Sequence, residues 1–154
     1  MNAVIEREDA MIDEFGFAYT LVFGGDSSPG FVYTSGLAEK GLPEFIFVGS
    51  SEARSHGYLT EFVKHVMVGG ALPIGRYQVG SPPNPFRVPA WVVEADDKLE
   101  THAFGVASRL RRIGSDVKPR LLQIVMPDLV GRFPWEPGYE WMNQMVYEEP
   151  QTTD

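Results

Sequence analysis

The sequence contains no cysteine. Without a thiol the protein cannot form a disulfide bond, a cysteine zinc site or a thiolate nucleophile. It also has no apolar run of about 18 residues, the length that a membrane-spanning helix needs. The first fourteen residues are acidic and lack the apolar region of a secretory signal. We therefore expect a cytoplasmic protein that does not cross a membrane.

Basic residues are scarce and unevenly placed. The chain has 13 Lys and Arg against 21 Asp and Glu, a net charge of −8, and no basic residue follows Arg132. One basic group stands out in the second half: Arg109, Arg111, Arg112, Lys118 and Arg120. Its three arginines end an expected helix, where the helix dipole favours cations. Because binding to nucleic acid depends on a large basic surface, we expect no nucleic-acid partner.

Motifs for catalysis and cofactor binding are also missing. The sequence has three histidines but no His-Glu-x-x-His motif, no Gly-x-Ser-x-Gly motif, and no Gly-Lys-Ser/Thr after the turn at 24–30. We expect the histidines at helix borders or in solvent. The sequence predicts no metal site and no cofactor, and it leaves open whether the protein is an enzyme.

Hydrophobic periodicity predicts the elements of the fold. Strands are expected at 17–23, 31–34, 44–48, 74–79, 86–94 and 121–126. A short amphipathic helix is expected within 1–15, and longer helices from Ser50 or Ser51 to Gly69 and from Asp96 or Asp97 to Gly114. The nearly all-apolar segment 44–48 suits a central strand that is buried on both faces. Pro89 restricts its strand to an edge or a bulge.

This order of elements favours an α+β fold. We expect a single domain over residues 1–154, with a mainly antiparallel sheet of about five or six strands and two main helices. The core is expected at about 15–145, followed by an acidic, frayed tail at 148–154. We see no internal repeat and no linker that divides the chain.

A loop rich in proline and aromatic residues follows the last strand, over Met126–Tyr139. Phe133 and Trp135 are large side chains that a solvated loop does not need. Asp128, Arg132 and Glu136 stand among them at intervals of four residues. The loop is either a clamp on the protein's own core, pinned by an Arg–carboxylate pair, or a recognition surface. Burial would raise the pKa values of the two carboxylates and the guanidinium would lower them, so Asp128 and Glu136 are candidate acid–base groups.

The end of the second strand is the other candidate region. Tyr33 and Thr34 place two hydroxyl groups beside the turn at Gly36. They are either ordinary strand residues or part of a pocket with the aromatic loop. Tyr33 is thus a third catalytic candidate, as a hydrogen-bond donor.

Three segments resemble an uncharacterised bacterial and phage family that is known as a domain of unknown function. They are Phe31–Leu37, Pro43–Gly49 and Gln123–Tyr139, which match F-x-Y-T-x-G-L, P-E-(apolar)₄-G and Q-x-V-x-P-D-x-x-G-R-F-P-W-D-P-G-Y. Departures are Ser35, Met126 and Glu136, where the family has an apolar residue, Trp and Asp. The resemblance covers about residues 15–145 and implies no particular chemistry. It points to these binding residues: Tyr33, Thr34, Gly36, Glu44, Asp128, Gly131, Arg132, Phe133, Trp135 and Glu136.

Two functions of different class follow from these features. The first is a small binding protein with a protein partner, such as a phage or mobile-element accessory factor that acts on a host protein, because the loop has the composition of interface hot spots. The alternative is an enzyme or small-ligand domain, with an anionic ligand held by Arg132 in a pocket between the Tyr33–Thr34 strand end and the Asp128–Tyr139 loop. A third possibility is that both motifs are structural. The oligomeric state is not predicted.

Overall fold

The computed structural model of the chain describes residues 3–22, 30–48, 52–69, 75–79, 88–125 and 132–139. The side chains of 52–58, 61, 65, 75–79 and 88–90 are not described. The α-helices are α1 (Ala3–Phe15), α2 (Glu52–Gly69) and α3 (Phe104–Arg112), and two short 3₁₀ helices are η1 (Ala38–Lys40) and η2 (Asp96–Lys98). The strands are β1 (Ala18–Val22), β2 (Phe31–Ser35), β3 (Glu44–Val48), β4 (Gly75–Val79), β5 (Val88–Glu94) and β6 (Leu121–Val125).

The strands form one six-stranded sheet in the order β1-β2-β3-β6-β5-β4. Four of the five pairings are antiparallel, and the central pair of β3 and β6 is parallel. The predicted α+β fold with a mainly antiparallel sheet is therefore confirmed. All five residues of β3 are buried, as its apolar sequence predicted, because it lies inside the sheet between β2 and β6.

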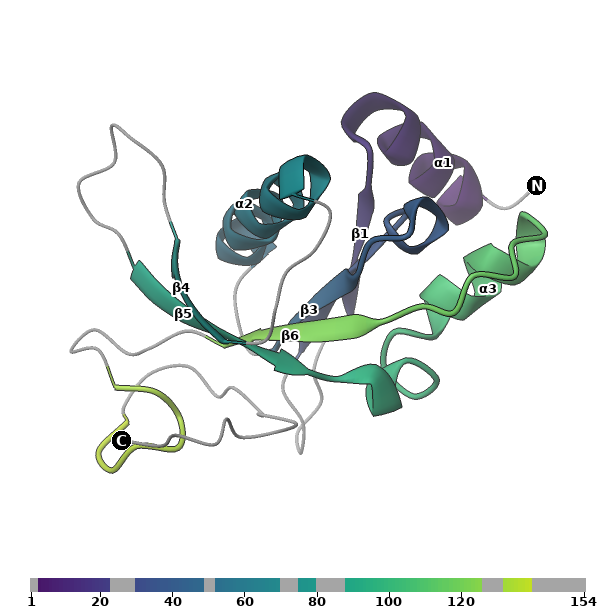
Figure 1. Cartoon of the computed structure of the whole chain (residues 1–154). Coiled ribbons are helices and arrows are strands. Elements are labelled where there is room, and N and C mark those ends of the chain that lie inside the picture. The colour runs from purple at the N-terminus through teal and green to yellow at the C-terminus, as the bar shows by residue number, and fades with distance from the viewer. Residues whose placement is uncertain are drawn as a thin grey trace.

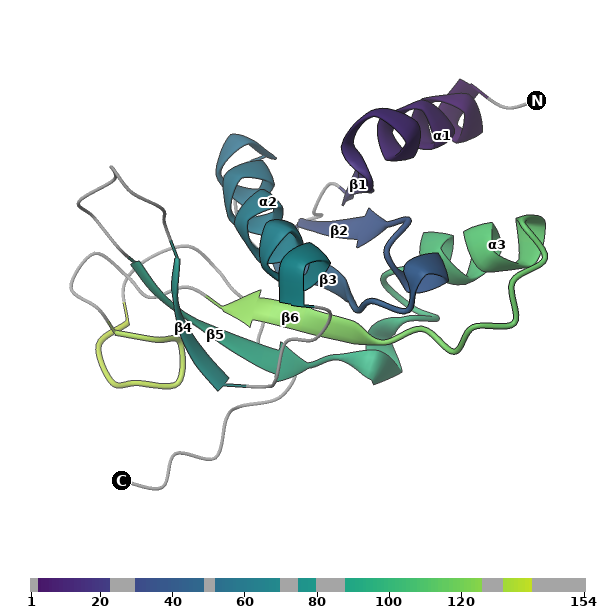
Figure 2. The same cartoon turned by 45° about the horizontal axis from the view of Figure 1, so that its top comes forward.

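Helices cover both faces of the sheet (Figures 1 and 2). Phe45 and Phe47 of β3 point to the face where α2 packs, and they share a core with Leu59, Phe62, Val63 and Val66 of that helix. Ile46 and Val48 point to the opposite face, where they share a core with Val106 and Leu110 of α3. The alternation of side chains along β3 thus supplies two apolar cores from one strand.

Helix α1 lies beside the edge strand β1, and Gly16 ends it. The Gly16 N–H donates to the carbonyl of Ile12 over 2.8 Å, and Gly16 has φ +90°. This left-handed conformation is the usual end of a helix and favours glycine. Among the described residues of α1, Ile12 is the buried one. The remaining side chains of this helix are available for the contacts described below.

The region before α3 differs from the prediction. A single helix was expected from Asp96 or Asp97 to Gly114, but the chain forms η2, then a turn, and α3 begins only at Phe104. The Lys98 carbonyl accepts hydrogen bonds from the N–H groups of His102 (2.8 Å) and Ala103 (3.1 Å), which closes the turn. Ala103 has φ −102° and ψ 42°, outside the helical region. Leu99 and Ala103 still pack with α3 in the same core, so apolar residues recur at helical spacing from Leu99 onward although the helix begins later.

Pro89 lies in an interior strand of the sheet, whereas the sequence predicts an edge strand or a bulge at this residue. Strand β5 lies between β4 and β6. Within the described residues, β6 pairs with Trp91–Glu94, and Pro89 is paired on one side, with Gln78 of β4. The described part of the sheet thus places Pro89 where one side of β5 is an edge, and a proline is tolerated there although it has no N–H. The predicted tail at 148–154 lies outside the described residues. None of the described helices has the length and apolar character that crossing a membrane requires.

Candidate functional site

The aromatic loop packs on the protein's own sheet. Phe133 is buried and stacks on Trp135, with ring centroids 5.2 Å apart and an interplanar angle of 4°. Trp91 of β5 meets both rings edge-on, at 6.5 Å from Phe133 and 6.0 Å from Trp135. Val93 and Val125 complete this small apolar cluster. The described part of the loop therefore has the geometry of a clamp on the core.

Polar groups of the loop take part in its own folding. The Phe133 N–H donates to Oε1 of Glu136 over 3.2 Å, and the Glu136 N–H donates to the Phe133 carbonyl over 2.8 Å. The Arg132 guanidinium lies against Gly138, where an added Cβ would stand 2.5 Å from Nη1. Gly138 has φ +84°, which also favours glycine. Asp128 and Gly131, which were predicted to act here, lie outside the described residues.

The strand-end motif forms a buried hydrogen-bond network around Glu44. Its carboxylate accepts from the Thr34 hydroxyl (2.8 Å) and from the N–H groups of Leu37 (3.1 Å) and Ala38 (3.0 Å). The Thr34 hydroxyl in turn accepts from the Phe45 N–H over 2.9 Å. Burial raises the pKa of Glu44 to about 7, against these three hydrogen bonds, which favour the charged form. Glu44 therefore holds the start of η1 onto the sheet.

Tyr33 and Gly36 are also occupied by packing. Tyr33 is buried in the core beneath α3, its hydroxyl lies close against Gly105, and burial raises its pKa. Gly36 has φ +97°, and an added Cβ would stand 2.8 Å from Cγ1 of Ile12. The absence of a side chain at Gly36 is what lets α1 approach the end of β2.

Among the described residues, the structure does not bring the two predicted motifs together. Residue 44 pairs with residue 121 in the parallel β3–β6 pair, so Thr34 and Glu44 lie at the end of the sheet where β6 begins. The aromatic loop follows the other end of β6, where Val125 pairs with Trp91. Figure 1 shows the loop and η1 at opposite ends of β6. The sequence did not reveal this arrangement. Which strand ends lie at the same edge of a sheet depends on the relative directions of the strands, and a local sequence pattern does not give these directions.

A partly buried ionic cluster, centred on the buried Arg109, lies on one side of α1. Arg109 of α3 binds Glu39 in a fork, with Nε to Oε1 at 2.6 Å and Nη2 to Oε2 at 3.2 Å, and its Nη1 donates to Asp9 over 2.6 Å. Arg112 donates to Asp9 (3.1 Å) and Glu8 (3.2 Å), and Glu8 also accepts from the Ser35 hydroxyl (2.8 Å). These hydrogen bonds lower the pKa of Asp9.

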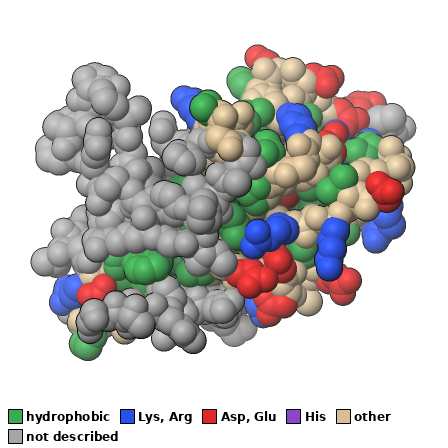
Figure 3. Space-filling view, in the orientation of Figure 1, with side chains coloured by type: hydrophobic (Ala, Val, Ile, Leu, Met, Phe, Trp, Pro, Cys, Tyr) green, Lys and Arg blue, Asp and Glu red, His purple; other side chains and the backbone are tan. Residues whose placement is uncertain are grey.

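This pairing accounts for much of the basic group that the sequence shows. Arg109 and Arg112 face carboxylates, and Arg120 lies 3.7 Å from Asp96. On the face of the molecule seen in Figure 3, acidic and basic side chains are interspersed over the described surface. Three of the five residues in this basic group, Arg109, Arg112 and Arg120, thus face protein carboxylates.

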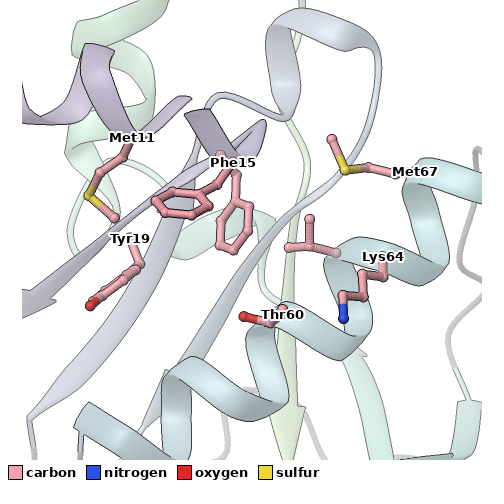
Figure 4. A pocket seen from close by; sticks show the side chains of 8 residues that line it. Met11, Phe15, Tyr19, Thr60, Lys64 and Met67 are labelled. Atoms are coloured by element: carbon pink, nitrogen blue, oxygen red, sulfur yellow. The ribbon is translucent and has the colours of Figure 1, made fainter. Parts of the chain in front are cut away.

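An open apolar cleft lies on the other side of α1 (Figure 4). Its volume is about 510 Å³. Three elements and the turn after α1 supply its walls: Met11, Phe15, Phe17, Tyr19, Thr60, Val63, Lys64 and Met67. Lys64 is the one charged residue among these described residues. Small-molecule sites have volumes of about 300–1,000 Å³ and apolar walls with a few polar groups, so this cleft is the candidate site.

The turn that joins α1 to β1 sets the width of the cleft. An added Cβ on Gly16 would stand 2.5 Å from Cε of Met67, so a glycine lets the two walls approach here. Lys40 donates to the Gly16 carbonyl and ties this turn to η1. The cleft is consequently bounded by residues that the backbone holds in place, while the side chains of Met11 and Met67 can adapt to a guest.

None of the cleft residues was among the predicted site residues. The sequence did place Met11 and Phe15 within the first predicted helix, and Val63 and Met67 within the second. One signal of the cleft was available: α2 carries more apolar residues than one face of the sheet can cover. In the structure, Met67 and Val68 of this helix are 43% and 92% exposed. That signal alone does not tell an open cleft from a closed core.

Comparison with known proteins identifies the family of the chain. A family model described as "Domain of unknown function (DUF4262)" matches residues 11–140. The chain therefore belongs to the DUF4262 family, which confirms the resemblance to a family of unknown function. No curated protein and no solved structure matches the chain significantly.

Proposed function

We propose that this DUF4262 protein is a binding protein that holds a small, predominantly apolar molecule in the cleft between α1 and α2. The single observation that carries this proposal is the cleft itself, with a volume of about 510 Å³ and an apolar lining. Its size is that of a small-molecule site, and its walls come from elements that are anchored elsewhere in the fold. The site lies away from both motifs that the sequence singled out.

The exposed fractions of the lining support occupancy by a guest. Phe15 is 60% exposed and Met67 is 43% exposed, although both belong to apolar faces of helices. Covering the exposed part of a Phe side chain stabilises a complex by about 1–2 kcal/mol. Val63, at the base of the cleft, is only 1% exposed, so the floor is already part of the core. A guest would extend that core outward between the two helices.

The test is the binding of 1-decanol, followed by NMR of ¹³C-labelled methionine methyl groups. The methyl signals of Met11 and Met67, assigned with Leu variants, are expected to shift in a saturable manner. Thr60→Trp should fill the cleft and weaken binding at least tenfold. Val68→Trp introduces the same side chain on the same helix, at a residue outside the lining. This control variant should bind 1-decanol like the wild type. Equal binding by both variants, or no saturable shift in the wild type, contradicts the proposal.

A protein partner is the second candidate, and the exposure of Phe15 and Met67 favours it. An apolar side chain of a partner would enter the same cleft. The aromatic loop gives this candidate less support, because Phe133 is buried and Trp135 packs on Trp91. Competition decides between the two: a partner that enters the cleft is displaced by 1-decanol and lost in Thr60→Trp. The accessory role in a phage or mobile element stays a prediction from the sequence.

A further inference from the structure

We infer that the cleft selects amphiphiles with one negatively charged head group, which Lys64 binds at the rim while the apolar tail fills the interior. This inference rests on the proposed function, since it names the class of ligand for the same site. It goes further in assigning a direction to the bound molecule and a specific role to one residue.

The polar atoms of the lining are gathered on one side. Figure 4 shows the hydroxyl groups of Tyr19 and Thr60 and the ammonium group of Lys64 along the same border of the cavity. The side chains of Met11 and Met67 lie across the cavity from that border, and aromatic rings stand between. A ligand that is polar at one end and apolar at the other fits this division, because each end then meets groups of its own kind.

The charge of the lining favours an anion. Among the described residues of the lining, Lys64 is the one cation, and none of them is an Asp or Glu. Among the side chains that the structure describes, no carboxylate forms an ion pair with Lys64. This differs from Arg109 and Arg112, which are surrounded by acids. An ammonium group offers three donors and no acceptor, so its complement is an acceptor that carries negative charge.

The net charge of −8 strengthens the assignment to Lys64. The field of an acidic protein repels anions at long range, so recognition of an anion must come from a local cation. The hydroxyl groups of Thr60 and Tyr19 lie along the same border as that cation (Figure 4), and a hydroxyl is of a kind that can donate to an oxygen of the head group. The apolar walls lower the local dielectric and strengthen the short-range attraction.

The experiment compares ligands with the same ten-carbon tail and different heads: decanoate, decyl phosphate, 1-decanol and decylamine, each below its micelle concentration. Affinities are measured by isothermal titration calorimetry at fixed pH and salt. The wild type is expected to bind at least one of the two anions about threefold to tenfold more tightly than 1-decanol, and decylamine most weakly. The tighter anion identifies the geometry of the head group.

Variants at Lys64 assign the effect. Lys64→Met keeps an exposed helix former of similar length and is expected to abolish the preference of the protein for the anions over 1-decanol, measured as the ratio of the two affinities in the same variant. Lys64→Arg should retain the preference. Lys118→Met removes the same charge at an exposed position outside the lining and should behave like the wild type. Circular dichroism and thermal melting verify that each variant is folded.

The possible failures are distinguishable. Equal affinity for the anions and 1-decanol in the wild type overturns this inference and leaves the proposed function standing. An anion preference that survives in Lys64→Met overturns the role of Lys64. If none of the four ligands binds, the proposed function fails and this inference fails with it.

Discussion

On the side that faces α3, helix α1 places Glu8 and Asp9 against Arg109 and Arg112, whereas toward α2 it places Met11 and Phe15 along an open cleft. The first side is closed and its charged groups are paired. The second side is apolar and unfilled. Both belong to one helix of thirteen residues.

The difference shows how a small domain can keep an apolar cavity open. Hydrophobic burial is not directional, so a helix held by apolar contacts alone would shift until the cavity closed. Ion pairs and hydrogen bonds fix distance and angle. Because the charged side and the packing of Ile12 on Gly36 fix α1, the helix does not move to close the cleft on its other side.

The largest expected effect comes from breaking the charged side. Arg109→Ala leaves Glu39, Asp9 and Glu8 around a site that has lost its main cation, and Arg109 is only 8% exposed. The free energy of unfolding, measured with urea, is expected to fall by about 3–5 kcal/mol. Arg111→Ala, on the exposed face of the same helix, should cost less than about 1 kcal/mol. Similar losses of unfolding free energy in the two variants would contradict the conclusion that the ion pairs of Arg109 fix α1.

A smaller loss is expected at the contact between α1 and the end of β2. Gly36→Ala puts a Cβ 2.8 Å from Ile12 and requires φ +97° of a residue with a side chain, for a cost of about 2–4 kcal/mol. Gly114→Ala is the matched control, because Gly114 also has a positive φ of +73° but its Cβ would meet nothing within 4 Å. The control should cost about 1–2 kcal/mol from the backbone alone. Equal losses of unfolding free energy in the two variants would show that the Ile12 side chain moves aside at no cost and does not fix the position of α1.

The third prediction concerns pH. The folded-state pKa of Glu44 is raised to about 7 from 4.5, so the folded protein holds this proton more tightly than the unfolded chain. Its stabilising contribution is fully present below about pH 4.5 and is lost as the pH rises through about 7. Between pH 5 and 8 the wild type should lose about 2–3 kcal/mol relative to Glu44→Gln. Urea midpoints of both proteins at several pH values measure this difference.

The variant is needed because other groups titrate in the same range. His102 has a lowered pKa, chiefly from burial, and its contribution to stability has the opposite dependence on pH. Subtracting the stability–pH curve of Glu44→Gln from that of the wild type removes the contribution of His102, which both proteins share. A flat difference curve would contradict the assignment to Glu44. The binding of 1-decanol is expected to stay constant over this range, since none of the described residues that line the cleft is a carboxylate.

Local patterns predicted the elements well, for reasons that are visible in single segments. The apolar run 44–48 predicted a strand buried on both faces, and α2 ended at Gly69, as the Gly69-Gly70 pair predicted. Such patterns depend on residues that are close in the sequence. The helix expected before α3 failed for a related reason: Leu99 and Ala103 have helical spacing, yet they pack from a turn.

The sequence by itself determined the α+β class, the central place of β3, the positions of most elements and membership of a family of unknown function. Only the tertiary structure decided the site. The parallel pairing of β3 with β6 put the two predicted motifs at opposite ends of the sheet. The cleft depends on where α1 docks, and that is set by contacts such as Asp9 with Arg109, which are 100 residues apart. No local pattern encodes such a contact, because it forms only when the complete chain has folded.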